Sequence, residues 1–186
     1  FGMLCDVLGG LQRGGVYVIA ARPGDGKTDI ALQLAVTLAK DYRVDYRSLE
    51  MSTEQLTHRI LSRACIINST KFRDHRISEN EQKRIGMVVD AMKGLHLVMD
   101  DTASISADDV EAKLAASKPD VMFIDYLGLM KGDTSGKKPL WQVTGETMHA
   151  LKASAKRHNA VIVALVQMNR SVDKQKEPTL SDLRGS

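Results

Sequence analysis

The chain has 186 residues, of which 43% are hydrophobic and 26% are charged, and this composition excludes an intrinsically disordered protein. The 26 Lys and Arg residues against 23 Asp and Glu residues give a formal charge of +3, which permits contact with a polyanion without requiring it. No apolar stretch approaches the roughly 18 residues that a membrane-spanning helix needs, so we expect no membrane partner.

The first predicted element is a strand over residues 16–20, a short run of β-branched and apolar side chains. A helix is predicted over residues 30–39, where only Gln33 and Thr37 interrupt the apolar sequence. Because these two residues lie four apart on one face, we expect this helix to be almost completely buried. A second strand is predicted over residues 43–49.

Two capping boxes mark the starts of the next helices. Ser52 is followed three residues later by Gln55, and Ser78 is followed by Glu81, so each pair can satisfy backbone N–H groups reciprocally. The first box predicts a helix through about Ile66. After the second box, one apolar stripe at helical spacing is formed by Ile85, Val88, Val89 and Met92.

The second half of the chain continues the alternation of strands and helices. In order, we expect a strand over 95–99, a helix from Ser106 that stops before Pro119, an apolar strand over 121–124, a polar loop over 132–138, a helix over 140–157 and a strand over 160–166. Five strands with intervening helices predict an α/β fold with a mainly parallel sheet covered on both faces. At about 150 residues per domain, the length predicts a single domain.

Cysteine usage bears on the cellular compartment. Cys5 and Cys65 are too few for a disulfide framework or for a tetrahedral metal site, so we expect both to be small buried side chains. A cytoplasmic protein is the corresponding expectation.

A glycine-rich segment separates the first strand from the first helix. It reads Ala21-Arg22-Pro23-Gly24-Asp25-Gly26-Lys27-Thr28 and matches the phosphate-loop pattern, except that alanine stands at the usual first glycine. In such loops, backbone amides surround an anion, the lysine neutralises the β- and γ-phosphates, and the threonine hydroxyl ligates Mg²⁺. The alternative is a structural turn with a surface lysine. The flanking strand and helix favour a nucleotide site.

A nucleotide hydrolase also needs a carboxylate near Mg²⁺. One predicted strand ends in Asp100 and Asp101, and another ends in Asp125. The strand before Asp125 is the more completely apolar, as expected of a central strand beside the phosphate-loop strand, whereas His96 interrupts the other. The pattern therefore favours Asp125, and it favours strand-end turn and helix-capping roles for Asp100 and Asp101.

Glu50 and Gln167 each follow a predicted strand. The carboxyl ends of parallel strands meet at the edge where α/β proteins bind their ligands. Glu50 could therefore point at a γ-phosphate, and the amide of Gln167 could sense it. Strands also end in polar residues without such a role, so the pattern alone leaves a surface role open for both residues.

Several segments resemble those of the DnaB-type replicative helicases, in which alanine is common at the first position of the phosphate loop. Ser48-Leu49-Glu50-Met51 is similar to the family's second block, and Ile124-Asp125-Tyr126-Leu127 is similar to its Walker B strand. Two further segments, Gln167-Met168-Asn169-Arg170-Ser171-Val172 and Ser181-Asp182-Leu183-Arg184, resemble its late blocks. The match spans nearly the whole chain in the family's order.

The resemblance implies a RecA-like P-loop motor domain that binds and hydrolyses ATP with Mg²⁺. In that family the glutamate matching Glu50 polarises the attacking water, and the aspartate matching Asp125 supports Mg²⁺ together with the threonine matching Thr28. The glutamine matching Gln167 contacts the γ-phosphate. The resemblance thereby gives catalytic roles to Glu50, Gln167 and Lys27, and it selects Asp125 over Asp100.

The resemblance also implies movement along single-stranded DNA. Two loops would face the channel of such a motor: one contains Lys137 and Lys138, and the other contains Arg170 and Lys174. Their cations would neutralise phosphates without reading the base sequence. Aromatic residues make up only 4% of the chain, which argues against a platform of stacked bases. Taken alone, each loop is also typical of a solvated surface.

The resemblance further implies an assembly. The family works as a hexameric ring that unwinds duplex DNA with ATP at its subunit interfaces, with primase and a helicase loader as partner proteins. Relative to the family, the chain is expected to lack the N-terminal domain and linker helix and to stop before the closing strands and the arginine finger. Because an arginine finger accelerates cleavage by about 10³- to 10⁵-fold, we expect the 186-residue chain to bind ATP but to hydrolyse it slowly.

Three other functions use the same phosphate loop. A RecA/RadA-type recombinase would share the fold and form filaments instead of closed rings. A small-molecule kinase would need an acceptor pocket and an arginine-bearing lid, and no such segment stands out in the sequence. A nucleotide-binding scaffold that has lost turnover is the third alternative.

Overall fold

The computed structural model describes residues 9–131 and 140–168 of the chain. The strands in these ranges are β1 (Val16–Ala21), β2 (Val44–Ser48), β3 (Leu97–Asp100), β4 (Val121–Asp125) and β5 (Val161–Gln167). The helices are α2 (Lys27–Leu38), α3 (Thr53–Cys65), α4 (Ser69–Arg73), α5 (Glu79–Met92), α6 (Ala107–Ser117) and α7 (Leu140–Arg157), with a 3₁₀ turn η1 (Leu127–Leu129). Neither α4 nor η1 is predicted from the sequence, whereas the other elements are. Within these ranges, no helix combines the length and the apolar character that crossing a bilayer demands.

The five strands form one parallel sheet in the order β1-β5-β4-β2-β3. β4 lies in the middle of the sheet, as its apolar sequence predicts. However, β5 pairs with β1 on one side and with β4 on the other. The expectation that the strand ending in Asp125 lies directly beside the phosphate-loop strand is therefore wrong, because β5 is inserted between them.

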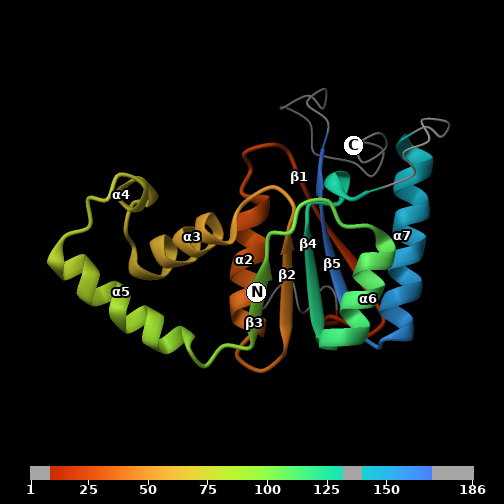
Figure 1. Ribbon diagram of the computed structural model, residues 1–186, viewed down its shortest axis with the longest axis horizontal. Helices are drawn as coiled ribbons and strands as arrows, with labels where there is room; N and C mark the ends of the chain where they lie inside the picture. Colours follow the sequence, from red (N-terminus) through yellow and green to blue (C-terminus); the bar gives the residue numbers. More distant parts are fainter. Residues whose placement is uncertain (1–8, 132–139, 169–186) are drawn as a thin grey trace.

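Helices cover both faces of the sheet, with α2 and α3 on one face and α6 and α7 on the other (Figure 1). Successive side chains of a strand point to opposite faces. β4 accordingly packs Val121 and Phe123 against α2, and it packs Met122 and Ile124 against α6 and α7. Every residue of β4 is buried, which confirms the prediction of a strand covered on both faces.

Three helices begin at a capping box. The side chains of Ser52, Ser78 and Ser106 each accept a hydrogen bond from the backbone N–H of the residue three positions later. The side chain of that later residue accepts a hydrogen bond from the backbone N–H of the serine. These contacts confirm the predicted starts of α3, α5 and α6. They involve only neighbouring residues, which is why the sequence alone reveals them.

Two expectations about helix burial need correction. α2 buries Ala31, Leu32 and Ala35 against the sheet, but Ile30 is 49% exposed and lies on the outer face together with the exposed Gln33 and Thr37. α2 is therefore buried along one face only and is not almost completely buried. On α5, Val89 is 41% exposed, because the side chains of the stripe that pack inward are Ile85, Val88 and Met92.

A buried ion-pair network ties the edge strand β3 to β2. The Arg47 guanidinium, on a residue that is 5% exposed, donates hydrogen bonds to Asp45 at 2.5 Å and to Asp100. The ammonium of Lys113 on α6 lies 3.6 Å from Asp100. Hydrogen bonds from Thr102, aided by these two cations, hold the pKa of Asp100 at about 2. Removing Arg47 would leave the buried carboxylate of Asp45 without its cation and Asp100 with Lys113 as its remaining cation, so we expect the loss to be destabilising.

Helices α3, α4 and α5 extend to one side of the sheet and enclose a small apolar cluster of their own (Figure 1). Its buried members are Leu61, Cys65, Ile67 and Phe72. Burial raises the pKa of the Cys65 thiol, and the residue is the inert, buried cysteine that we expect. Cys5 lies outside the described residues.

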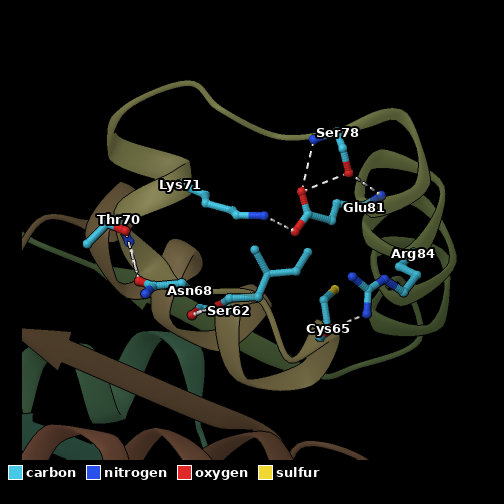
Figure 2. A network of polar contacts seen from close by, with 9 residues as sticks. Ser62, Cys65, Asn68, Thr70, Lys71, Ser78, Glu81 and Arg84 are labelled. Atoms are coloured by element: carbon cyan, nitrogen blue, oxygen red, sulfur yellow. Dashed lines mark hydrogen bonds and ion pairs between the residues drawn. The ribbon is translucent and has the colours of Figure 1, made fainter.

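A polar link closes this cluster between α4 and α5 (Figure 2). The Lys71 ammonium donates to Glu81 Oε1 at 2.6 Å, and the backbone N–H and the hydroxyl of Ser78 both donate to Oε2 at 2.9 Å. Glu81 is 8% exposed, so three donors compensate one largely buried carboxylate. The link holds α4 to the first turn of α5.

We expect this link to weaken in acid. The hydrogen bonds from Lys71 and then from Ser78 lower the pKa of Glu81 from 4.5 to about 2. A carboxyl with a lower pKa in the folded state stabilises the fold above its unfolded pKa, and this contribution is lost as the pH falls through the folded pKa.

The Glu81→Gln variant should therefore melt at a lower temperature than the wild type at pH 7, with a difference that narrows as the pH falls below 4.5. Glu79→Gln, at an exposed position in the same helical turn, is the matched control. A difference that stays constant from pH 7 into this acid range would contradict the assignment.

Candidate nucleotide site

The phosphate loop joins β1 to α2, and its geometry suits an anion. Gly24 and Gly26 have φ angles of 88° and 80°, in the left-handed region that glycine adopts without strain. Gly26 is the N-cap of α2 and offers no side-chain hydrogen bond to the first turn. The free backbone N–H groups of this turn, together with the helix dipole, form a site for a phosphate group.

One pocket of about 410 Å³ opens above this loop and brings together most of the predicted site residues. Its walls include Ala21, Arg22, Pro23, Gly24, Gly26, Lys27, Thr28, Glu50 and Gln167. Asp25 is exposed and does not line the pocket. Residues from three separate strand ends therefore meet at one edge of the sheet, as expected for parallel strands.

Glu50 and Gln167 reach the pocket for different reasons. Gln167 is the last residue of β5 and stands in register with Ala21 at the end of β1, directly beside the phosphate loop. Glu50 follows β2 in the bend that precedes α3, and its side chain is exposed. The structure thus places both residues facing the same space, where an exposed carboxylate can reach a water molecule.

Asp125 lies beneath the pocket and is 1% exposed. Its Oδ2 accepts a hydrogen bond from the Thr28 hydroxyl at 2.8 Å, and its Oδ1 lies 3.2 Å from the Lys27 ammonium. The Lys27 ammonium also lies 4.1 Å from the centre of the Tyr126 ring. Lys27 Nζ and Asp125 Oδ1 are both buried and make no hydrogen bond within the described residues. These atoms retain bonding capacity for a phosphate and for a cation.

Asp100 and Asp101 serve other contacts. Asp100 belongs to the Arg47 network and accepts a turn hydrogen bond from the Thr102 backbone at 2.8 Å. The Asp101 carboxylate accepts a hydrogen bond at 2.8 Å from the backbone N–H of Thr53, the first residue of α3. The structure therefore brings Asp125, and not Asp100, against the phosphate loop, and it gives the pair the turn and capping contacts that the pattern favours.

The donor set fits Mg²⁺ shared with a nucleotide. A hydroxyl and a carboxylate are hard oxygen ligands, and Mg²⁺ is commonly held by one or two carboxylates together with substrate phosphates. The described residues contain no group of three or more His, Cys, Asp or Glu side chains that could hold a metal by themselves. A cation bound by Thr28 and Asp125 would complete its coordination with phosphate oxygens and water.

Sequence reasoning missed two groups of site residues. Arg59 and Met51 also line the pocket, where the Arg59 guanidinium lies 3.2 Å from the carboxylate of Asp29. Tyr46 is completely buried and donates a hydrogen bond to Asp125 Oδ2 at 2.8 Å. Burial, and then the charge of Asp125, raise the pKa of Tyr46 far above its usual value, so this hydroxyl remains protonated. Strand alternation predicts burial of Tyr46 but not its partner.

The candidate DNA-binding residues lie outside the described residues. This applies to Lys137 and Lys138 after η1, and to Arg170 and Lys174 after β5. Their predicted contacts with DNA stay predictions.

The whole chain is similar in sequence to one family of known proteins. It matches the family model of the DnaB-like helicase C terminal domain over residues 1–186. It is 34% identical over 185 residues to the replicative DNA helicase DnaB of Geobacillus stearothermophilus and 33% identical over 201 residues to that of Rickettsia prowazekii (strain Madrid E). These matches cover 95% and 98% of this chain but only 41% of the length of each relative.

Solved structures agree with this match. A DnaB-like replicative helicase, described with its interactions with primase, superposes with a TM-score of 0.91 at 28% identity, covering 100% of this chain and 48% of that one. A second solved structure, described as an ATPase domain, gives 0.92 at 28% identity and covers 100% and 69%. The RadB recombinase gives 0.55 at 16% identity, covering 98% and 75%, which shows a shared fold alone. Because the family model spans the whole chain and the site carries the expected phosphate loop, this chain belongs to the DnaB-like helicase C-terminal domain family.

Proposed function

We propose that this domain is the ATP-hydrolysing motor of a replicative DNA helicase and that it binds ATP with Mg²⁺ in the phosphate-loop pocket. The observation that carries the proposal is the contact of two pocket-lining residues, Lys27 and Thr28, with the buried carboxylate of Asp125. Membership of the family, whose relatives here are replicative DNA helicases, supports a helicase motor over a recombinase or a small-molecule kinase.

In this proposal the residues divide the work of phosphate cleavage. The backbone amides of the phosphate loop and the Lys27 ammonium hold the β- and γ-phosphates, while Thr28 and Asp125 hold Mg²⁺. When bound, Mg²⁺ neutralises the charge that develops on the phosphate oxygens. Glu50 polarises the attacking water from the rim of the pocket, and the Gln167 amide contacts the γ-phosphate from the end of β5.

Coupling to DNA is the second part of the proposal. Subunits assemble as a hexameric ring with ATP at their interfaces, move along single-stranded DNA and unwind the duplex. Lys137, Lys138, Arg170 and Lys174 contact DNA phosphates in the channel, which makes binding dependent on salt and independent of sequence. Primase and a helicase loader are the proposed partner proteins, in the cytoplasm. The primase is suggested by the solved helicase that is described with it.

The test uses the full-length protein that contains this domain and measures ATP binding and phosphate release. A fluorescent ATP analogue is titrated with and without Mg²⁺, and phosphate release is followed with and without single-stranded DNA. We expect the ATP analogue to bind with full affinity only when Mg²⁺ is present. We expect phosphate release to become faster when single-stranded DNA is added. Absence of nucleotide binding would overturn the site. Binding with release that ignores DNA would overturn the motor, and a phosphorylated small-molecule product would identify a kinase.

A further inference from the structure

The Tyr46 hydroxyl is the feature of the site that the proposed roles leave unused. The side chain projects from β2 into the layer beneath α2 and is completely buried. Tyr46 stands opposite Phe123 in the register of β2 and β4, and the two rings stack with their centroids 5.5 Å apart. From there the hydroxyl reaches along the neighbouring strand to Asp125, two residues beyond Phe123.

The contact has a defined direction. The hydroxyl lies 2.8 Å from Asp125 Oδ2, and an ionised carboxylate can only accept, so Tyr46 is the donor. The same oxygen accepts from the Thr28 hydroxyl at 2.8 Å, while Oδ1 faces the Lys27 ammonium. Asp125 is thus held from two sides, by α2 and by β2.

The three partners of Asp125 are not equivalent. Lys27 and Thr28 line the pocket and are the side chains proposed to bind the phosphates and Mg²⁺. Tyr46 does not line the pocket, and its rigid ring is fixed by its stack on Phe123. Its hydrogen bond can therefore persist when Lys27 turns to a phosphate. Partners that orient a ligand from behind commonly change metal affinity by about 10- to 100-fold when they are removed.

We propose that Tyr46 is a positioning residue that sets the orientation of the Asp125 carboxylate for Mg²⁺-nucleotide. This inference rests on the proposed function of the site and extends it to a residue outside the pocket. A purely structural role, in which Asp125 merely satisfies a buried hydroxyl, would affect stability alone. The two roles differ in whether the response to Mg²⁺ depends on Tyr46.

The test is the Tyr46→Phe variant, which removes only the hydroxyl and keeps the stacked ring. Mg²⁺ is titrated into the protein with a fluorescent ATP analogue at fixed concentration. Binding of the same analogue is measured separately in excess EDTA. We expect the Mg²⁺ midpoint to rise by about 10-fold, at the low end of such effects, while binding in EDTA stays at the wild-type level. Tyr42→Phe, at an exposed turn position, is the control that should leave both unchanged.

Two comparisons keep the outcomes separate. In an Asp125→Ala background, which removes the acceptor, Tyr46→Phe should no longer shift the midpoint, because the proposed effect acts through Asp125. A wild-type midpoint in Tyr46→Phe, or an equal shift in both backgrounds, would overturn the positioning role and leave the proposed function standing. A wild type that binds no nucleotide at all would overturn both. Should the phenylalanine variant lose its melting transition, Tyr46→Met, with a flexible apolar side chain, takes its place.

Discussion

Replacing Glu50 with glutamine is expected to slow ATP hydrolysis by about 10²- to 10⁴-fold, the range that a general base contributes. Glutamine keeps the size of the side chain but cannot take a proton from water. ATP affinity should stay close to that of the wild type, because Glu50 is exposed at the pocket rim. The side chains that contact Asp125, and that are proposed to hold the phosphates and Mg²⁺, are Lys27 and Thr28. The measurements are phosphate release at saturating ATP and equilibrium binding of a fluorescent analogue.

Glu54→Gln provides the matched control for this experiment. Glu54 lies in the first turn of α3, is exposed, and is not part of the pocket wall, so its loss of charge should leave the rate unchanged. Equal rates for Glu50→Gln and the wild type would remove Glu50 from the mechanism. Equal losses in both variants would point to the general negative charge of this region instead.

Replacing Lys27 with methionine is expected to weaken ATP binding by about 10- to 100-fold, since a hydrogen bond to a charged group contributes about 1.5–3 kcal/mol. Lys27 is 8% exposed at the base of the pocket, where its ammonium is held between Asp125 and the face of Tyr126. Methionine keeps the unbranched stem and removes the charge. Calorimetric titration with ATP and Mg²⁺ measures the loss.

The nature of the ligand offers a sharper check on Lys27. Adenosine lacks the phosphates that this ammonium is proposed to hold, so its weaker binding should be insensitive to Lys27→Met. Lys40→Met, at an exposed position beyond the C-terminal end of α2, should change the affinity for neither ATP nor adenosine. A loss of affinity that is as large for adenosine as for ATP would indicate that the variant disturbs the fold and not the phosphate contact.

Features that depend on neighbouring residues are predictable from this sequence. The capping boxes at Ser52 and Ser78 are complete within four residues, and the structure places helix starts at both. The phosphate loop is likewise a contiguous signal, and its glycines take the left-handed φ angles that the pattern requires. The hydrophobic run before Asp125 predicts a central, fully buried strand because apolar side chains occupy both of its faces.

Features that depend on residues far apart in the chain are not predictable from this sequence. Nothing in the local sequence of β5 indicates that it separates β1 from β4, because strand order is decided by packing across the whole sheet. The exposure of Ile30 follows from which face of α2 meets the strands, and an apolar sequence alone does not reveal that face. The hydrogen bond between Tyr46 and Asp125 joins residues on two strands whose pairing the sequence does not state.

The place of β5 in the sheet has a consequence for biosynthesis. A nascent chain emerges from the ribosome with its N-terminal elements first, and domains generally fold as units once they are complete. Here β1 and β4 share no backbone hydrogen bonds, and the strand that joins them comes after both in the chain. Until residues 161–167 have left the exit tunnel, the sheet lacks the strand that joins β1 to β4, and the phosphate loop meets the carboxylate on β4 only through the packing of α2. The nucleotide pocket, whose wall includes Gln167 at the end of β5, therefore cannot be complete before this strand has emerged.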